Sequence, residues 1–388
     1  MPASYRYLII GGGMTAAAAA AALRSTDPAG TIGLICAEEH PPYARPPLSK
    51  ALWKGEPESS IWRGTDKLGV DLRLGRRATA LDARAKTVTD DRGQVVSYDR
   101  LLLATGGTPR RLPIETDEII YFRTYDDYRK LRGLANDKRR FAVLGGGFIG
   151  SEIAAALKLV GRDVVMIIPE DGIGVRVFPA DLSQFLVKYY REQGVEVRTG
   201  EAVAGVARTR DALVLTTRGS QEIVVDAVVG GIGIQPNVDL AVQAGARVDN
   251  GIVVDELLRT SAPDIYAAGD VANFFNPALD TRLRVEHEDN ANTMGAAAGR
   301  AMAGRGTPYT HIPFFYSDLF SLGYEAVGEL DSRLEMVSDW KDPYREGVIY
   351  YQRGGLVRGV LLWSTWGQVD AARALIAEKG TATLGIAR

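Results

Sequence analysis

The sequence predicts an α/β fold in which one strand–turn–helix plan occurs twice and an α+β segment follows. The stretches "YLIIGGGMTAAAAAAAL" at 7–23 and "FAVLGGGFIGSEIAAAL" at 141–157 both read as an apolar strand, a glycine-rich turn and a helix. Each continues to a "GVDLRLG" or "GVEVRTG" strand, and then to alternating strands around an Arg-Gly turn. From about residue 306 the chain instead becomes rich in Tyr, Phe and Trp. This order indicates two domains of common plan and a third of different architecture.

Composition narrows the class of protein. The 388 residues, 46% hydrophobic and 24% charged, fit an ordinary globular chain of two or three domains. A formal net charge of -2, with both signs interspersed, argues against nucleic acid or an anionic membrane as the main partner. Cys36 is the only cysteine, which excludes an internal disulfide, a CxxC relay and a cysteine-based metal cluster. The alanine run at 16–22 is too short to span a bilayer, and no secretory signal is apparent, so we expect a cytoplasmic protein without a metal.

The first glycine-rich turn fits a phosphate-binding loop. Gly11, Gly13 and Ala16 follow the G-x-G-x-x-G/A pattern of Rossmann-like dinucleotide-binding domains. The helix that follows would offer free N–H groups and a positive dipole end to a pyrophosphate. The next strand, "TIGLICAEE", ends in Glu38, which is placed to accept hydrogen bonds from a ribose.

The second turn repeats this arrangement. Gly145, Gly147 and Gly150 keep the spacing, and the strand "DVVMIIPE" ends in Glu170. An acid there accepts from a ribose 2'-OH and repels a 2'-phosphate, so it predicts NADH rather than NADPH. Further on, "SAPDIYAAGDVANFF" at 261–275 is a strand that ends in Gly269 and Asp270. Its acid can bind a sugar-alcohol chain or cap a helix.

Together with "PPYARPPLSKALW" at 41–53 and "LLLATGG" at 101–107, these motifs resemble the FAD-dependent pyridine-nucleotide reductases. The closer resemblance is to the branch that holds ferredoxin reductases and apoptosis-inducing factor. It implies a split FAD domain at 1–115 and 237–305, an inserted NAD domain at 116–236, and a C-terminal α+β interface domain at 306–388. The first loop, Glu38 and Asp270 would bind FAD, and the second loop NAD.

The resemblance also implies the reactive residues. Glu152 of "GSE" would pair with Lys50 of "RPPLSK" beside the flavin, although an acid at a helix start is also favoured by the helix dipole. Phe148 would cover the nicotinamide pocket, or be an ordinary core residue. Glu286 and His287 would lie beside nicotinamide and flavin at the start of a helix over 284–304, or serve a structural role.

Two aromatic residues and five further positions complete the expected site. Tyr316 and Trp366 would lie near the flavin ring, or belong to the core. Cys36 lies inside its strand, and Ser49 stands in "PPLSK", so disulfide reductase and peroxidase chemistry are not expected. The remaining cofactor-binding positions implied by the resemblance are Arg45, Thr105, Gly106, Ile149 and Gly233.

Two functions follow from the resemblance. One is an enzyme that takes hydride from NADH and passes electrons to a one-electron acceptor such as a [2Fe-2S] ferredoxin. The other resembles apoptosis-inducing factor: a slow NADH oxidoreductase whose stable reduced FAD–NAD charge-transfer complex gates dimerisation or partner binding. The sequence leaves the acceptor and the oligomeric state open, a homodimer included.

Overall fold

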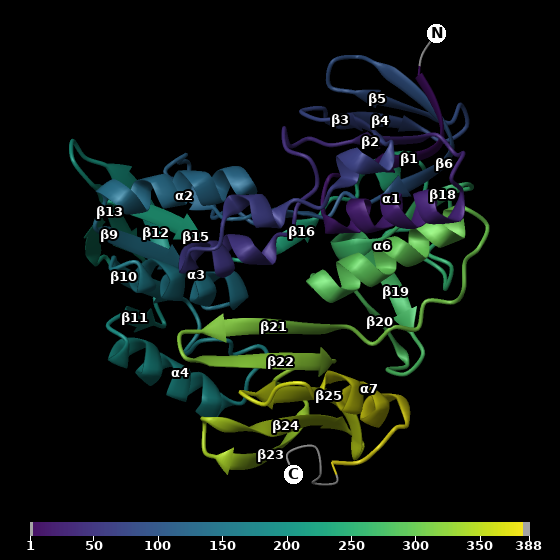
Figure 1. The fold of residues 1–388 in the computed structure, drawn as a ribbon. Helices are drawn as coiled ribbons and strands as arrows, with labels where there is room; N and C mark the ends of the chain where they lie inside the picture. Colours follow the sequence, from purple (N-terminus) through teal and green to yellow (C-terminus); the bar gives the residue numbers. More distant parts are fainter. Residues whose placement is uncertain (1–2, 383–388) are drawn as a thin grey trace. The chain divides into compact units, whose positions relative to one another are not determined.

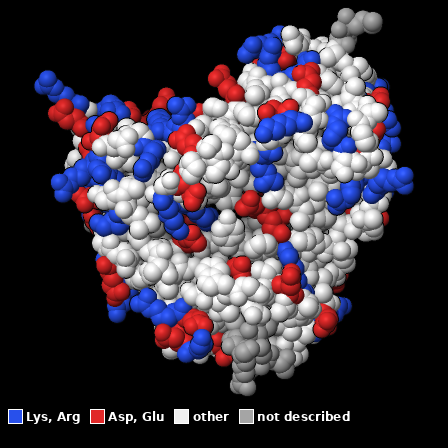
Figure 2. Space-filling model, in the orientation of Figure 1, with Lys and Arg blue, Asp and Glu red and all other residues white. Residues whose placement is uncertain are grey.

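The computed structural model describes residues 3–382, and these divide into two compact units. The first unit comprises the chain up to Arg45, Ser59–Thr108 and Gln235–Phe314. The second comprises Pro46–Glu58, Pro109–Ile234 and the chain from Phe315 onward. The short excursion at Pro46–Glu58 thus belongs by its contacts to the second unit. Within residues 3–382 (Figure 1), no helix combines the length and the hydropathy of a membrane span. Figure 2 shows Lys and Arg interspersed with Asp and Glu on the face that it displays.

The first unit is built on a sheet of order β3-β2-β1-β6-β5-β4, with β18 paired to β6 (Figure 1). The strands β3, β2, β1, β6 and β18 pair in parallel, while β4, β5 and β6 form an antiparallel meander. A smaller sheet joins β17, β19 and β20. The strands are β1 (Ala3–Ile10), β2 (Ile32–Ile35), β3 (Asp71–Arg73), β4 (Ala78–Asp82), β5 (Thr87–Asp90), β6 (Val95–Leu103), β17 (Ile252–Val253), β18 (Ile265–Ala267), β19 (Ala272–Asn276) and β20 (Thr281–Leu283).

Helices α1 (Met14–Thr26) and α6 (Glu288–Met302) pack closely in the first unit (Figure 1). A Cβ on Gly295 would lie 2.4 Å from the carbonyl oxygen of Thr15, and one on Gly299 would lie 2.5 Å from that of Ala19. Small residues on both helices therefore permit backbone contact, which explains the alanine run of α1. A short third α-helix of the described part of this unit is α5 (Asp239–Gln243).

The second unit contains the second copy of the plan, a parallel sheet of order β11-β10-β9-β15-β8 (Figure 1). The helices are α2 (Tyr125–Asp137), α3 (Phe148–Leu159) and α4 (Ala180–Glu192). The strands are β8 (Ile119–Tyr121), β9 (Arg140–Leu144), β10 (Asp163–Ile168), β11 (Glu196–Thr199), β12 (Val203–Arg208), β13 (Leu213–Thr217), β14 (Glu222–Val225) and β15 (Ala227–Gly230). The remaining short strands, β7 (Gly107–Pro109) and β16 (Ile234–Pro236), pair with each other.

The two copies differ in how their antiparallel strands join the parallel sheet. In the first, β6 runs unbroken from the meander into the parallel sheet. In the second, Asp226 interrupts the corresponding strand between β14 and β15, and β12, β13 and β14 form a separate sheet. The Asp226 carboxylate accepts hydrogen bonds from the backbone N–H groups of Arg139, at 2.9 Å, and Arg140, at 2.8 Å. Those bonds hold the break against the start of β9.

The C-terminal part of the second unit is an antiparallel sheet of order β21-β22-β25-β24-β23 with one helix, which confirms the predicted α+β architecture. Some of its aromatic residues form its core, and others contact Phe178 and α4. Tyr324, Tyr350, Tyr351 and Trp363 are all fully buried. The elements are β21 (Phe314–Leu319), β22 (Leu322–Gly328), β23 (Glu335–Asp342), β24 (Glu346–Arg353), β25 (Leu356–Trp363) and α7 (Val369–Ala377).

Candidate functional site

The first glycine loop, between β1 and α1, is shaped by three glycines. Gly11 has φ +126°, and a Cβ there would lie 2.1 Å from the carbonyl oxygen of Ala104, so only glycine fits. A Cβ on Gly12 would lie 2.0 Å from Sγ of Cys36. Gly13 is the N-cap of α1, and the nearest atom to a Cβ there is Arg45 Nε at 4.0 Å. Space therefore remains at the helix start, as a phosphate requires. Sequence reasoning missed the role of Gly12.

Glu38, beyond the end of β2, is held by two side chains. Tyr43 donates its hydroxyl to Oε2 at 2.5 Å, and Arg45 donates from Nη2 to Oε1 at 2.6 Å. The Arg45 guanidinium also lies over the Tyr43 ring, 5.2 Å from its centroid. These contacts orient the carboxylate while leaving lone pairs available to a ribose. The predicted positions Glu38 and Arg45 thus meet, and Tyr43 is an additional contact without a sequence signal.

Gly269 and Asp270 follow β18 at the carboxyl edge of the first sheet. Gly269 has φ +78°, and a Cβ there would lie 2.2 Å from Oγ1 of Thr15 at the start of α1. Its N–H points to Sδ of Met294, at 3.2 Å. The carbonyl of Asp270 accepts from Arg284 Nη1 at 3.1 Å. The structure therefore places this predicted acid in the same unit as the first glycine loop.

The helix expected over 284–304 spans Glu288–Met302, so it begins four residues later than predicted. His287 is its N-cap, and Glu286 lies before it. Glu286 lies outside the helix and forms an ion pair with Arg284 at 2.7 Å. Burial lowers the pKa of His287 to about 4, although the negative charges of Asp270 and Asp289 act to raise it. A neutral imidazole at neutral pH follows.

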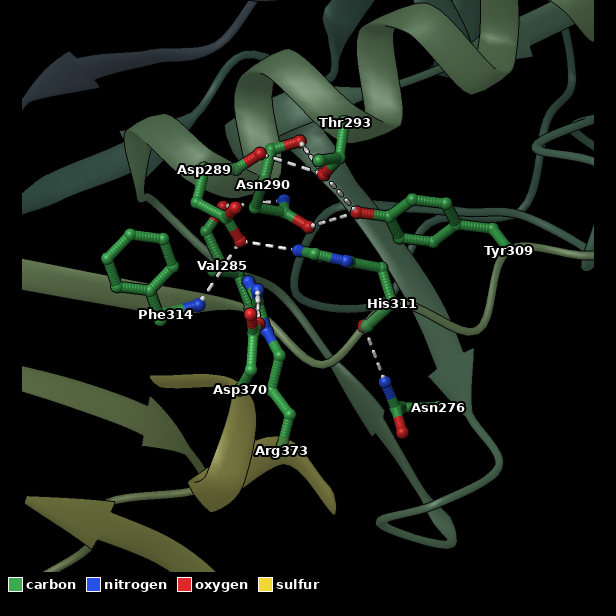
Figure 3. A network of polar contacts seen from close by, with 10 residues as sticks. All are labelled: Asn276, Val285, Asp289, Asn290, Thr293, Tyr309, His311, Phe314, Asp370 and Arg373. Carbon is green, nitrogen blue, oxygen red and sulfur yellow. Dashed lines mark hydrogen bonds and ion pairs between the residues drawn. The ribbon is translucent and has the colours of Figure 1, made fainter. Parts of the chain in front are cut away.

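The segment that leaves α6 is tied back to it by a polar network (Figure 3). His311 Nε2 lies 2.5 Å from Oδ2 of Asp289, which also accepts from the backbone N–H of Phe314 at 3.2 Å. The Tyr309 hydroxyl donates to Oδ1 of Asn290 at 3.0 Å. Asp289 and Asn290 lie in the first turn of α6, so this network fixes the helix start next to His287. Sequence reasoning missed it.

Three predicted positions carry structural contacts at the ends of buried strands. Thr105 donates from Oγ1 to the carbonyl of Asn237 at 2.7 Å, and Asn237 returns a bond from Nδ2 to the carbonyl of Thr105 at 2.9 Å. Gly106 has φ +61° and accepts at its carbonyl from the N–H of Asn237. Gly233, at φ +89°, accepts from the N–H of Arg110 at 2.9 Å. These glycines meet a backbone requirement, and a role in cofactor binding stays a prediction.

In the second glycine loop, between β9 and α3, different glycines meet the need for close packing and the need for open space. A Cβ on Gly145 would lie 2.6 Å from the carbonyl oxygen of Gly231, and one on Gly150 would lie 2.1 Å from that of Gly145. Gly147, the N-cap of α3, has no atom within 4 Å of a Cβ position. Gly145 and Gly150 therefore serve packing, and Gly147 leaves space at the helix start. Ile149, next to it, is exposed.

Glu152, on the first turn and a half of α3, is buried and meets three donors. Lys50 Nζ lies 2.8 Å from Oε1, and Ser317 donates to the same oxygen at 2.5 Å. Ser49 donates to Oε2 at 2.6 Å. Glu152 is only 3% exposed and the side chain of Lys50 only 12%, which removes most screening by water. The structure thus brings the predicted pair together, with two serines that sequence reasoning had not assigned to it.

One of the predicted aromatic residues lies against this pair, and the others have different neighbours. The Lys50 ammonium lies 5.3 Å from the ring centroid of Tyr316, a cation–π distance. Phe148, half-buried at the start of α3, lies 4.9 Å from Phe315, measured between ring centroids. Trp366 is 54% exposed, and it packs on Gly323, where a Cβ would lie 2.8 Å from Trp366 Cη2. Trp366 is therefore not a core residue.

Glu170, after β10, carries a cation beside it. Arg176 Nη2 lies 3.1 Å from Glu170 Oε1, and the Arg176 side chain is largely exposed. An exposed pair of this kind contributes little stability. The arrangement leaves a positive group within reach of whatever Glu170 binds.

The sequence matches the pyridine nucleotide-disulphide oxidoreductase family over residues 5–295. The chain belongs to this family. Residues 298–343 also match the C-terminal region of mitochondrion-associated apoptosis-inducing factor. The mitochondrial apoptosis-inducing factor 1 of Dictyostelium discoideum is 34% identical over 97% of this chain and 79% of that protein. The ferredoxin–NAD(+) reductase component of the anthranilate 1,2-dioxygenase system of Burkholderia cepacia is 37% identical over 83% of this chain and 81% of that protein.

Solved structures agree with this family. The crystal structure of the covalent putidaredoxin reductase–putidaredoxin complex superposes with a TM-score of 0.90 at 29% identity, covering 97% of this chain and 94% of that chain. The predicted fold class, two Rossmann-like domains with a C-terminal domain, is thereby confirmed.

Pyridine nucleotide-disulphide oxidoreductases use FAD and NAD(H), and both glycine loops fit these cofactors. Each loop has a helix start at which a Cβ would meet no close neighbour, beside a strand followed by an acid. The chain departs from the disulphide chemistry in the family's name, since Cys36 is its one cysteine. Burial raises the pKa of the Cys36 thiol to about 11, which keeps it protonated and unreactive.

Proposed function

We propose that this protein is an NADH-dependent FAD oxidoreductase that passes electrons to a one-electron acceptor, a [2Fe-2S] ferredoxin-type protein. The observation that carries the proposal is the buried ion pair between Lys50 and Glu152 on the helix of the second glycine loop. Such a pair is costly to bury, so its presence beside a nucleotide loop favours a functional role.

The cofactors are assigned to the loops as follows. FAD is held by Gly11, Gly13, Ala16, Glu38 and Asp270, with the FAD domain at 1–115 and 237–305. NAD is held by Gly145, Gly147 and Glu170, with its domain at 116–236, and the interface domain is 306–388. When bound, FAD accepts a hydride from NADH and releases electrons singly.

The chain's own residues bind, orient and shield. Lys50 would hold a positive charge toward the reactive rings, and Glu152 fixes the position of its ammonium. Phe148 and Ile149 at the start of α3, together with Tyr316 and Trp366, would border the nicotinamide and the flavin. His287, whose pKa is lowered by burial, would lie beside the rings without adding charge at neutral pH.

The acceptor class rests on the relatives. The Burkholderia cepacia protein is named as a ferredoxin–NAD(+) reductase component, and the superposable structure is a complex with putidaredoxin. Turnover with NADH and a [2Fe-2S] ferredoxin, against ferricyanide as a reference acceptor, tests the proposal. Reduction of ferricyanide without any ferredoxin reduction would contradict it.

A second function has its own support, because residues 298–343 match the apoptosis-inducing factor region. In that case NADH would produce a long-lived reduced complex that changes self-association or partner binding. Measuring mass in solution with and without NADH separates the two, since a homodimer formed only with NADH favours this alternative. A cytoplasmic location is proposed on the single cysteine, which suits a reducing compartment.

A further inference from the structure

We propose that Ser317 is a positioning residue, which sets how much of the Lys50 charge reaches the cofactor rings. This inference rests on the proposed function, in which Lys50 acts on those rings. Ser317 lies on β21, and its side chain is fully buried. It donates to Glu152 Oε1 at 2.5 Å, the same oxygen that Lys50 Nζ approaches at 2.8 Å. Ser317 and Lys50 therefore share one acceptor.

The direction of the Ser317 hydroxyl follows from its acceptor. A carboxylate that is ion-paired with Lys50 has no proton to give, so the Ser317 proton points to Glu152 Oε1. The strand next to β21 is β22, and its Tyr324 ring is held by a stacked contact with Trp363, at 5.7 Å and 7°. Ser317 thus donates from a rigid part of the sheet.

Ser49 completes the arrangement on the other oxygen. It donates to Glu152 Oε2 at 2.6 Å, and it lies in the excursion at 46–58, next to Lys50. The carboxylate is therefore bound by β21 on one side and by the excursion on the other. Its rotation is blocked, and so the ammonium that it holds keeps one position.

Removing the Ser317 hydroxyl changes how the carboxylate distributes its charge. Oε1 loses a donor, and its negative charge then acts more strongly on the Lys50 ammonium. A more fully neutralised ammonium stabilises negative charge on a neighbouring ring less well. Reduced FAD would be less favoured, and the flavin midpoint potential would fall.

The experiment measures the midpoint potential of the holoenzyme and its rate of reduction by NADH. In Ser317→Ala we expect the equilibrium constant for two-electron reduction to fall roughly three- to tenfold, a shift of about 15 to 30 mV to more negative potential. Ser317→Thr keeps the hydroxyl and should restore the potential. Ser338→Ala, on exposed β23 of the same sheet, is the matched control and should leave the potential unchanged.

Variants of Ser49 and Lys50 distinguish failure of this inference from failure of the proposed function. Ser49→Ala removes the donor to the other oxygen, and it tests the arrangement independently if Ser317→Ala folds poorly. If Lys50→Ala shifts the potential but Ser317→Ala and Ser49→Ala do not, this inference is wrong while the proposed function stands. If Lys50→Ala also leaves the potential unchanged, the proposed role of Lys50 fails and this inference fails with it.

Discussion

Lys50 Nζ and Glu152 Oε1 lie 2.8 Å apart, although Lys50 comes from the excursion at Pro46–Glu58 and Glu152 comes from α3, the helix after the second glycine loop. Burial makes each group dependent on the other, because a single buried charge left without its partner is strongly destabilising.

Glu152→Ala and Lys50→Ala should each slow flavin reduction by NADH at least tenfold while FAD stays bound. The increase in activation free energy of flavin reduction in the double variant should be far smaller than the sum of the increases in the two single variants. The difference is a coupling energy of about 1 to 3 kcal/mol, because the two groups act as one unit. Stopped-flow reduction rates measure this. Lys54→Ala, which breaks the exposed ion pair with Asp318, is the control and should change little. Wild-type rates in both single variants would remove the pair from the mechanism.

Coenzyme preference should depend on Glu170. The wild type should use NADH far better than NADPH, since a carboxylate opposite a 2'-phosphate costs several kcal/mol. Glu170→Ala should narrow that gap by roughly 10- to 100-fold, and part of the gain should vanish in Glu170→Ala/Arg176→Ala, because Arg176 is then missing as a phosphate partner. The kcat/KM values for both coenzymes measure this. Equal efficiency with NADPH in the wild type contradicts the assignment.

Two glycines of the second loop should respond differently to alanine. A Cβ on Gly147 meets open space, so Gly147→Ala should keep its melting temperature but raise the KM for NADH, because the methyl occupies the phosphate position. Gly150→Ala would place a Cβ 2.1 Å from the carbonyl oxygen of Gly145, and it should destabilise the protein by about 1 to 3 kcal/mol. Thermal melts beside NADH titrations distinguish the two. A Gly147→Ala protein with unchanged KM would argue against a phosphate there.

Acid should destabilise the protein through His287. Burial lowers its folded pKa to about 4, below the unfolded value of 6.5, so the unfolded chain binds the proton more readily between these values. This group leaves the free energy of unfolding unchanged above pH 6.5 and lowers it as pH falls from 6.5 to 4. In His287→Gln this part of the pH dependence should disappear, whereas it should persist in His40→Gln. Urea unfolding at pH 4.5 and pH 7 measures the difference.

Trp366 should protect the reduced protein from oxygen. It is exposed and packs on Gly323 beside the aromatic residues of the second unit. Trp366→Ala should raise NADH-dependent oxygen consumption severalfold and shorten the life of the long-wavelength charge-transfer band that NADH produces. An oxygen electrode and anaerobic titration measure both. Oxygen consumption by the wild type as fast as ferricyanide-coupled NADH oxidation would favour an oxidase instead.

Local sequence signals predicted the fold well because they record backbone demands. The spacing of Gly11 and Gly13 places a turn before a helix, and alternation around the Arg-Gly turns places the meanders. What the sequence could not show depends on partners far along the chain. Gly12 is needed because of Cys36, Ser317 matters because of Glu152, and the break at Asp226 follows from its bonds to Arg139 and Arg140. No periodicity records such pairs.

The backbone contact of α1 with α6 imposes an order on events at the ribosome. Helix α1 is made early, but Gly295 and Gly299, which cover its alanine face, emerge only after more than 200 further residues. At the usual pace of translation this is a wait of roughly 10 to 50 s. The sheet β11-β10-β9-β15-β8 uses only residues 119–230, so its strands are all synthesised during that wait. The parallel sheet of residues 119–230 should therefore fold first. The first unit should complete its fold last, when α6 packs on α1.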